Sequence, residues 1–256
     1  MIPWFQYTVI QVGPLSIQVW GLFVALGILT SFAIIWKRAA KFGMDKSTAL
    51  DLAFYLVLFG LIGARLFHVF LYEADYFLQN PVDILKIWQG GMSSWGGIVG
   101  AIGAFLWFFR RGKISRDRML ASADLFSFGA LYGWLVGRLG CLMIHDHLGR
   151  LSDSWLTIQT ASGSRIETTL LEILYLIPLA LIFFFVREKK LPDGFYFYAL
   201  VTYYGLLRFY LDFFRATDIS NADARFLGLT PAQYFGIIAA FVGARFLLKM
   251  KQKKVA

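Results

Sequence analysis

The 256-residue sequence is poor in charge, in cysteine and in polar linkers. Charged residues make up 16% of it, against roughly 25% in soluble globular domains, whereas 58% of its residues are hydrophobic. The single cysteine, Cys141, excludes an intrachain disulfide and a cysteine-based zinc site. The first residues lack a basic region and a cleavage site, so we expect no removable signal peptide. With a mean hydropathy of +0.62, the composition predicts a membrane protein that crosses the bilayer several times.

Seven apolar stretches approach the roughly 20 residues that a helix needs to cross the hydrocarbon of a bilayer. They cover residues 16–36, 50–72, 91–109, 119–140, 168–186, 195–214 and 231–248. The last begins with Pro231 after Thr230, which is typical of a helix start with Thr at the cap. We therefore predict an all-α integral membrane protein with seven transmembrane helices. No linker or low-complexity tract interrupts the chain, so we expect one domain over residues 1–256.

The basic residues alternate between the two sides of these spans. Most of the 25 Lys and Arg residues lie in the connections after the first, third, fifth and seventh stretches. Because cytoplasmic loops carry an excess of Lys and Arg, this pattern predicts an outside N-terminus and a cytoplasmic C-terminus. The net charge of +9 thus indicates topology and contact with anionic membrane lipid, and we expect no nucleic-acid partner.

Three arginines, Arg65, Arg138 and Arg208, lie inside spans, towards the outer end and close after glycines. A guanidinium with a pKa above about 12 keeps its proton and needs an anion, carbonyl groups or water. Glycines let helices pack closely, so we expect the three to share one outer-leaflet cavity that binds a phospholipid phosphate. Two alternatives remain: Arg138 extends to the interface, or the arginines pair separately with acids. Asp212, four residues after Arg208, would orient or neutralise it, and Glu172 is another candidate.

A glycine-rich segment, residues 90–97, opens the third span with the sequence GGMSSWGG. Two glycine pairs are unfavourable within a helix and suit close approach of the backbone. Free N–H groups around Ser93, Gly96 and Gly97 are therefore candidates to bind an anion in the same outer region. The alternative is an ordinary helix N-terminus with a serine cap.

The sequence His145-Asp146-His147 follows the fourth span and has three interpretations. Two histidines two residues apart with one acid are weak grounds for a metal site, so we expect no metal. A general base is more plausible because histidine titrates near neutral pH, and a solvated turn is the third interpretation, favoured for His147. His68 lies in the second span beside an apolar face, and we expect its side chain to be packed and hydrogen bonded to a carbonyl or hydroxyl. Cys141 suits a nucleophile or, more commonly, a small apolar residue of the core.

Five segments, taken in order, resemble those of the bacterial prolipoprotein diacylglyceryl transferases over nearly the whole length. GGMSSWGGIVG is similar to GGMSFHGGxxG, and VGRLGCLMIHDHLGR is similar to GRxGNFxNxExxGR. RIETTLLE is similar to RHPxxLYE, YGLLRFYLDFFR to YGxxRFxxEFFR, and LTPAQY to the glutamine-containing start of the family's last helix. Their order and spacing agree together with the seven-span prediction.

The resemblance implies a reaction and a location. The family transfers the diacylglyceryl group of phosphatidylglycerol to the lipobox cysteine of a prolipoprotein, at the outer face of the bacterial inner (cytoplasmic) membrane. It implies no cofactor. By position, Arg138 matches the family's phosphatidylglycerol-binding arginine and Arg208 its second essential arginine. Asp146 and Asp212 keep the family's acidic positions.

Four of the departures from the family pattern concern residues with possible chemical roles. Trp95 stands where the family has histidine in GGMSFHGG, Cys141 where it has asparagine, Trp20 where it has tyrosine, and Ile166 where it has the histidine of RHPxxLYE. If the missing imidazole is the base, another group replaces it, and His145 is the nearest candidate, with His147 behind it.

We therefore predict two groups of site residues. The predicted catalytic residues are Arg138, Arg208 and His145. The predicted substrate contacts are Arg138, Arg65, Ser93, Gly96, Gly97, Asp146, Asp212 and Glu172. The alternative function is a non-catalytic homologue that binds phosphatidylglycerol. A channel or transporter is less favoured, because no inverted repeat is visible and the intramembrane charges lie to one side of the bilayer midplane.

Overall fold

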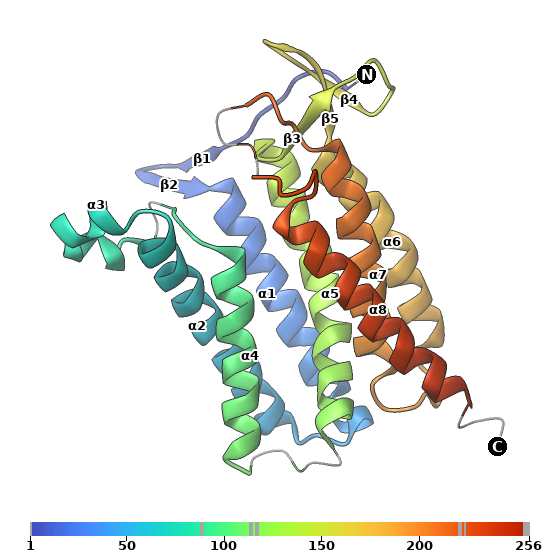
Figure 1. Ribbon diagram of the computed structural model, residues 1–256. Helices are drawn as coiled ribbons and strands as arrows, with labels where there is room; N and C mark the ends of the chain where they lie inside the picture. Colours follow the sequence, from blue (N-terminus) through green and yellow to red (C-terminus); the bar gives the residue numbers. More distant parts are fainter. Residues whose placement is uncertain are drawn as a thin grey trace. The chain divides into compact units, whose positions relative to one another are not determined.

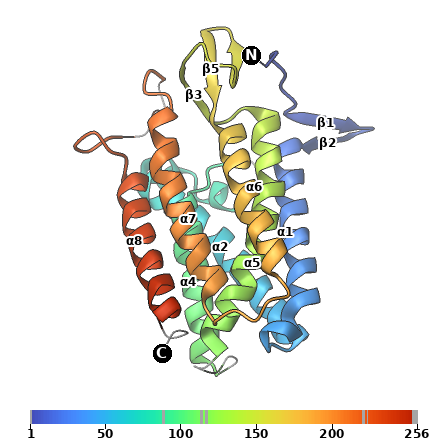
Figure 2. The same cartoon turned by 90° about the vertical axis from the view of Figure 1, so that its right-hand side faces the viewer.

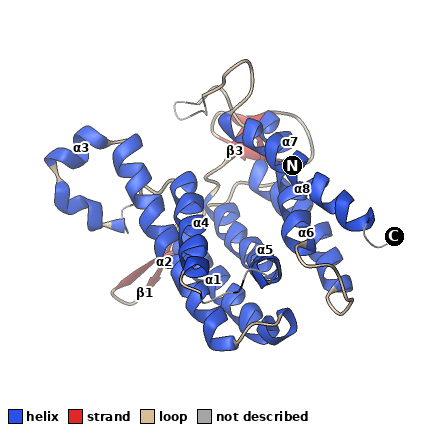
Figure 3. Cartoon of the chain, turned by 60° about the horizontal axis from the view of Figure 1, so that its bottom comes forward, coloured by secondary structure: helices blue, strands red, loops and turns tan. Residues whose placement is uncertain are grey.

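The structure, a computed structural model, describes residues 2–87, 90–112, 115, 118–219, 222 and 224–252. Helices dominate the described chain (Figure 3), and a long helix lies in each of the seven predicted stretches. These helices are α1 (Val19–Arg38), α2 (Lys46–Leu71), α4 (Ser94–Arg110), α5 (Met119–Ile144), α6 (Thr168–Val186), α7 (Phe195–Leu211) and α8 (Pro231–Gln252). The prediction for α1 began too early, because residues 16–18 belong to a strand.

Among the described residues, five helices are long and apolar enough to cross a membrane. They comprise α1 with the 3-10 turn η1 (Ala39–Phe42), α2, α5, α6 and most of α8. α4 is a shorter apolar helix, and α7 has 17 residues. The protein is therefore a multi-pass membrane protein, mostly helical, and the count of seven spans stays a prediction.

The chain forms two compact units, and the first comprises Ile35–Ser122. In it, the Asp45 carboxylate caps α2 by accepting hydrogen bonds from two backbone N–H groups of the first turn. α2 and α4 pack side by side (Figure 1), and α3 (Ala74–Gln79) and the 3-10 turn η2 (Pro81–Leu85) lie between them in sequence. A Cβ atom on Gly63 of α2 would lie 2.3 Å from the carbonyl oxygen of Gly96 on α4, so glycine sets this close approach.

The second unit comprises Met1–Ile34 and Ala123–Ala256. In Figure 2 its helices run roughly alongside one another, with a small sheet at the end where α5 finishes and α6 starts. Glycines again bring backbones together: a Cβ atom on Gly205 of α7 would lie 2.5 Å from the oxygen of Gly236 on α8, and one on Gly133 of α5 would lie 2.4 Å from the oxygen of Gly27 on α1. The predicted single domain over residues 1–256 stays a prediction.

Two small sheets belong to the second unit. A hairpin joins β1 (Val9–Val12) to β2 (Leu15–Gln18). The segment between α5 and α6, residues 145–167, contains an antiparallel sheet of β3 (Leu148–Leu151), β5 (Gly163–Glu167) and β4 (Thr157–Thr160), in that spatial order. The N-terminal chain adds to its edge, where the N–H of Ile2 donates to the carbonyl of Thr157 at 2.7 Å. The sheet fixes the chain between α5 and α6, where the candidate site lies.

Candidate active site

Arg138 lies near the end of α5 and pairs with Glu172 in the first turns of α6. Its Nε donates to Oε1 of Glu172 at 2.9 Å, and the two side chains are only 16% and 6% exposed. Its Nη1 lies 3.7 Å from Sγ of the buried Cys141, and its guanidinium lies 5.9 Å from the ring centre of Trp134. Pairing of this kind offsets the cost of removing two charges from water. Arg138 therefore pairs with its own acid, which was one of the alternatives left open by the sequence.

Arg208 and Asp212 form a second ion pair, which lies at the end of α7. Asp212 begins the 3-10 turn η5 (Asp212–Phe214) and has no exposed side-chain surface. Its Oδ1 lies 3.2 Å from Nη2 of Arg208, whose side chain is 21% exposed. Asp212 therefore lies where it can orient Arg208 while that guanidinium keeps access to the surface.

Thr230 connects this pair to the start of α8. Its hydroxyl donates to Oδ2 of Asp212 at 2.5 Å. Thr230 and Gln233 also form a capping box: the Thr230 N–H donates to the Gln233 side-chain oxygen, and the Gln233 N–H donates to the Thr230 hydroxyl. The prediction of a helix start with Thr at the cap and Pro231 following it is confirmed. The cap of α8 thus also holds the carboxylate that faces Arg208.

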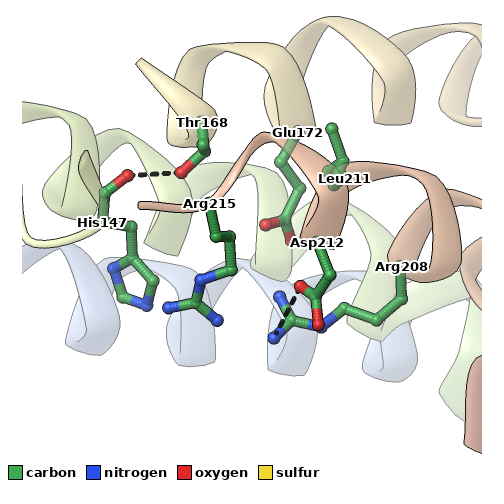
Figure 4. A pocket seen from close by; sticks show the side chains of 7 residues that line it. All are labelled: His147, Thr168, Glu172, Arg208, Leu211, Asp212 and Arg215. Carbon is green, nitrogen blue, oxygen red and sulfur yellow. Dashed lines mark hydrogen bonds and ion pairs between the residues drawn. The ribbon is translucent and has the colours of Figure 1, made fainter. Parts of the chain in front are cut away.

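A small pocket that opens to solvent lies beside these groups. Figure 4 shows its lining side chains, with Arg208 against Asp212 and the His147 imidazole near Arg215. The lining residues are His147, Thr168, Glu172, Arg208, Leu211, Asp212 and Arg215. Glu172 is shared, since it lines the pocket and holds Arg138. The elements that build this pocket are therefore the chain after α5, the start of α6 and the end of α7 with η5.

The two histidines of the His-Asp-His segment lie in different environments. The His145 side chain has no exposed surface, and its Nδ1 lies 2.6 Å from Oε2 of Glu167. The rings of Trp4 and Phe5 cover it, with centroids 5.1 and 4.6 Å from that of the imidazole. Burial raises the pKa of Glu167, and the hydrogen bond from His145 opposes that rise. His145 is thus a core residue and does not line the pocket.

His147 is partly exposed and lines the pocket. Its side chain is 32% exposed, and its Nδ1 lies 2.5 Å from Oδ1 of Asp146, at ion-pair distance though outside the angular range of a hydrogen bond. The Thr168 hydroxyl donates to the backbone carbonyl of His147. The solvated turn that the sequence favours for His147 therefore faces a site containing arginines.

Arg65, the third arginine, belongs to the unit Ile35–Ser122, and backbone carbonyls surround it. Its Nε and Nη2 donate to the carbonyls of Ile84 and Asp83 at 2.9 and 2.6 Å. Its Nη1 donates to those of Gly90 and Gly91 at 2.6 and 2.9 Å. The side chain is buried and holds the loop between α2 and α4, so this geometry supports a structural role. Its predicted contact with substrate stays a prediction.

The N–H groups of the predicted anion site at the start of α4 already have partners, and that of Ser93 donates to the carbonyl of Ala64 on α2 at 2.9 Å. The Ser93 side chain accepts from the N–H of Gly96, and the N–H of Gly97 donates to the Ser93 carbonyl at 3.0 Å. The alternative of a serine-capped helix N-terminus therefore describes this turn. The contacts of Ser93, Gly96 and Gly97 with substrate stay predictions.

The sequence analysis did not predict several residues that line or support the pocket. Arg215 ends the same FFR segment that carries Arg208, yet the sequence alone gave it no role. The Thr-Pro-x-Gln pattern at 230–233 is a recognisable capping box, but nothing in it indicates that the threonine also binds Asp212. Thr168 and Leu211 carry no chemical signal of their own.

Comparison with known proteins gives a consistent result. The family model described as prolipoprotein diacylglyceryl transferase matches residues 7–249. A protein of Oleidesulfovibrio alaskensis named phosphatidylglycerol–prolipoprotein diacylglyceryl transferase is 33% identical over 239 residues, covering 90% of this chain and 88% of its own. Proteins of the same name from Caldanaerobacter subterraneus and Staphylococcus aureus are 30% and 29% identical to this chain. The two alignments cover 81% and 82% of this chain, respectively, and 77% of each relative. The similarity therefore extends over nearly the whole chain.

Proposed function

The chain belongs to the prolipoprotein diacylglyceryl transferase family, and on this basis we propose that the pocket at the end of α7 binds the phosphate of phosphatidylglycerol during the family's reaction. The protein is a transferase that moves the diacylglyceryl group from phosphatidylglycerol to a prolipoprotein, the first step of lipoprotein lipidation. The acceptor is the thiol of the lipobox cysteine. The non-catalytic alternative is not favoured, because the relatives are named as transferases.

The arginines at the pocket are the observation that carries this proposal. Arg208 and Arg215 line it, and Arg138 joins its wall through Glu172. Glu172 and Asp212 are the lining acids. Planar guanidinium donors suit phosphate oxygens.

The carboxylates of Glu172 and Asp212 act by orienting the guanidinium groups of Arg138 and Arg208. Glu172 accepts a hydrogen bond from Nε of Arg138, whose Nη1 lies 3.7 Å from Sγ of Cys141. Asp212 holds one terminal nitrogen of Arg208. In the transfer, the thiolate sulfur attacks the glyceryl carbon that carries the phosphate, and the bond from that carbon to oxygen breaks. Negative charge then grows on the phosphate oxygens, where fixed guanidinium donors stabilise the transition state.

The position in the membrane follows the charge pattern of the sequence. We place the pocket towards the outer leaflet of the bacterial inner membrane, with seven spans, an outside N-terminus and a cytoplasmic C-terminus. The basic residues after α4 and in the last turns of α8 support a cytoplasmic location for those ends. Phosphatidylglycerol would reach the site from the surrounding lipid.

A transfer assay on the purified full-length protein tests the function. The protein is reconstituted with phosphatidylglycerol and given a synthetic lipobox peptide, and mass spectrometry follows the peptide. We expect a gain of one diacylglyceryl unit on the cysteine, absent when phosphatidylethanolamine replaces phosphatidylglycerol or when the peptide carries serine instead of cysteine. Binding of phosphatidylglycerol without any mass gain would contradict the proposal and support the non-catalytic alternative.

A further inference from the structure

The reaction needs a group that takes the proton of the acceptor thiol, whose ordinary pKa is about 8.5. The chain has three histidines. His68 belongs to the unit Ile35–Ser122, where its Nε2 lies 3.6 Å from Oε2 of Glu73. His145 is enclosed by the core, and His147 lines the pocket that contains Arg208. Among the described residues that line this pocket, His147 is the only histidine.

We propose that His147, supported by Asp146, is the general base of this enzyme. This inference rests on the proposed function, because it assigns a role in the same transfer. It also departs from the prediction made for His145, and it fits a chain in which Trp95 stands where the family pattern has histidine.

The contacts of His147 suit this role. Oδ1 of Asp146 lies 2.5 Å from Nδ1, so a negative charge is available to stabilise the imidazolium that forms when Nε2 accepts a proton. The hydrogen bond from the Thr168 hydroxyl to the His147 carbonyl fixes the backbone at the start of β3. The 32% exposure of the side chain leaves the ring accessible to a substrate.

His145 does not have that access. Its Nδ1 is engaged with Glu167, and its Nε2 is buried, without a hydrogen-bond partner in the described part of the chain. The Trp4 and Phe5 rings lie over it. A thiol could reach this imidazole only if the N-terminal segment moved away. His145 instead fixes the direction in which the chain leaves α5, with a φ of 51°.

The proton and electron balance of the step is complete without a further reactant. His147 Nε2 takes the thiol proton, and the sulfur forms a bond to the glyceryl carbon. The bond from that carbon to the phosphate oxygen breaks, and its electron pair stays on that oxygen. The glycerol phosphate leaves from the arginines, and the imidazolium then returns its proton to that phosphate or to water.

Five charged groups lie around His147, either lining the same pocket or adjacent to it. Two come from its own segment and α6, and three from α7 and the residues that follow it. They are Asp146, Glu172, Arg208, Asp212 and Arg215.

The test compares transfer rates of full-length variants at pH 7 and pH 9.5. At pH 9.5 most of the thiol is already ionised, so a missing base matters less. His147→Gln is expected to lower the rate constant at pH 7 by about 10²- to 10⁴-fold, and this deficit is expected to shrink at least tenfold at pH 9.5. Asp146→Asn is expected to show a smaller deficit, about tenfold at pH 7, that shrinks in the same way.

Two control variants show whether the pH-dependent loss of rate is specific to His147. Arg208→Gln removes a phosphate contact, so its deficit is expected to be similar at both pH values. His68→Gln removes a histidine that is not among the lining residues of the pocket and is expected to keep the rate within about twofold. Size-exclusion profiles in detergent check that each variant is folded.

Three results would overturn the inference. The first is a His147→Gln protein that is within twofold of the wild type at pH 7. The second is a deficit of equal size at both pH values, and the third is a pH-sensitive deficit in His145→Gln alone. If the wild-type protein itself transfers nothing, the proposed function fails together with this inference, and that outcome is distinct from the other three.

Discussion

Asp212 has no exposed side-chain surface, yet two neighbours contact its carboxylate from different elements. Oδ2 accepts the Thr230 hydroxyl, and Oδ1 faces Arg208 at 3.2 Å. Arg225 also donates to the Asp212 backbone carbonyl at 2.8 Å. A buried carboxylate that loses a donor bears a desolvation cost of about 1–3 kcal/mol, more for a full charge. The position of Arg208 therefore depends on a hydroxyl that contacts no substrate in our proposal.

Replacing Thr230 by valine tests this dependence. Valine keeps the shape of the side chain and removes the hydroxyl that binds Asp212. We expect kcat/KM for diacylglyceryl transfer to fall about tenfold or more, because 1.4 kcal/mol corresponds to a factor of ten. Thr230→Ser keeps the hydroxyl and is the matched control, expected to stay within about threefold. Equal activity of the valine and serine proteins would show that the Thr230 hydroxyl is not needed to position Asp212 and Arg208.

At the scale of helices, glycines decide which pairs touch through their backbones. A Cβ atom on Gly100 of α4 would lie 2.1 Å from the carbonyl oxygen of Phe59 on α2, whereas one on Gly103 of the same helix would meet nothing within 4 Å. Close backbone approach of this kind is a common basis of helix association in lipid. The sequence shows glycines at both positions and does not say which of them is a contact.

The two glycines therefore make a matched pair for a stability measurement. Gly100→Ala is expected to lower the apparent Tm of the detergent-solubilised protein by several degrees, because α4 must move away from α2. Gly103→Ala is expected to leave the Tm unchanged or to raise it, since alanine favours a helix over glycine by roughly 1 kcal/mol. The opposite order of the two Tm values would show that α2 and α4 do not pack as described.

The elements also show where sequence reasoning succeeds. Long apolar stretches place the seven helices within a few residues, because length and hydropathy are local properties. The β3–β5–β4 sheet was missed, since its strands have only four or five residues and depend on pairing between β5 and both neighbours. Its edge strand β4 also pairs with Ile2, a contact of long sequence separation that no local pattern reveals.

For the molecule as a whole, sequence motifs identify the chemistry better than they assign each residue. Arg138, Arg208, Glu172 and Asp212 were all expected near one another, and they meet at or beside one pocket. Arg65 was also expected to contact substrate, which stays a prediction; in its own unit, four backbone carbonyls accept hydrogen bonds from its guanidinium. Whether an intramembrane arginine faces substrate or backbone depends on tertiary contacts. Those contacts also separate His145 from His147, which the sequence places only two residues apart.

The arginines of the α5–α7 region are proposed to stabilise the departing phosphate. The most direct measurement follows glycerol phosphate release and thioether formation together, in the wild-type protein and in Arg138→Gln and Arg208→Gln. We predict one glycerol phosphate per thioether in the wild type and a loss of about 10²- to 10³-fold in kcat in each variant, with the protein still folded in the membrane. Variants whose kcat stays within about threefold of the wild type would contradict the claim.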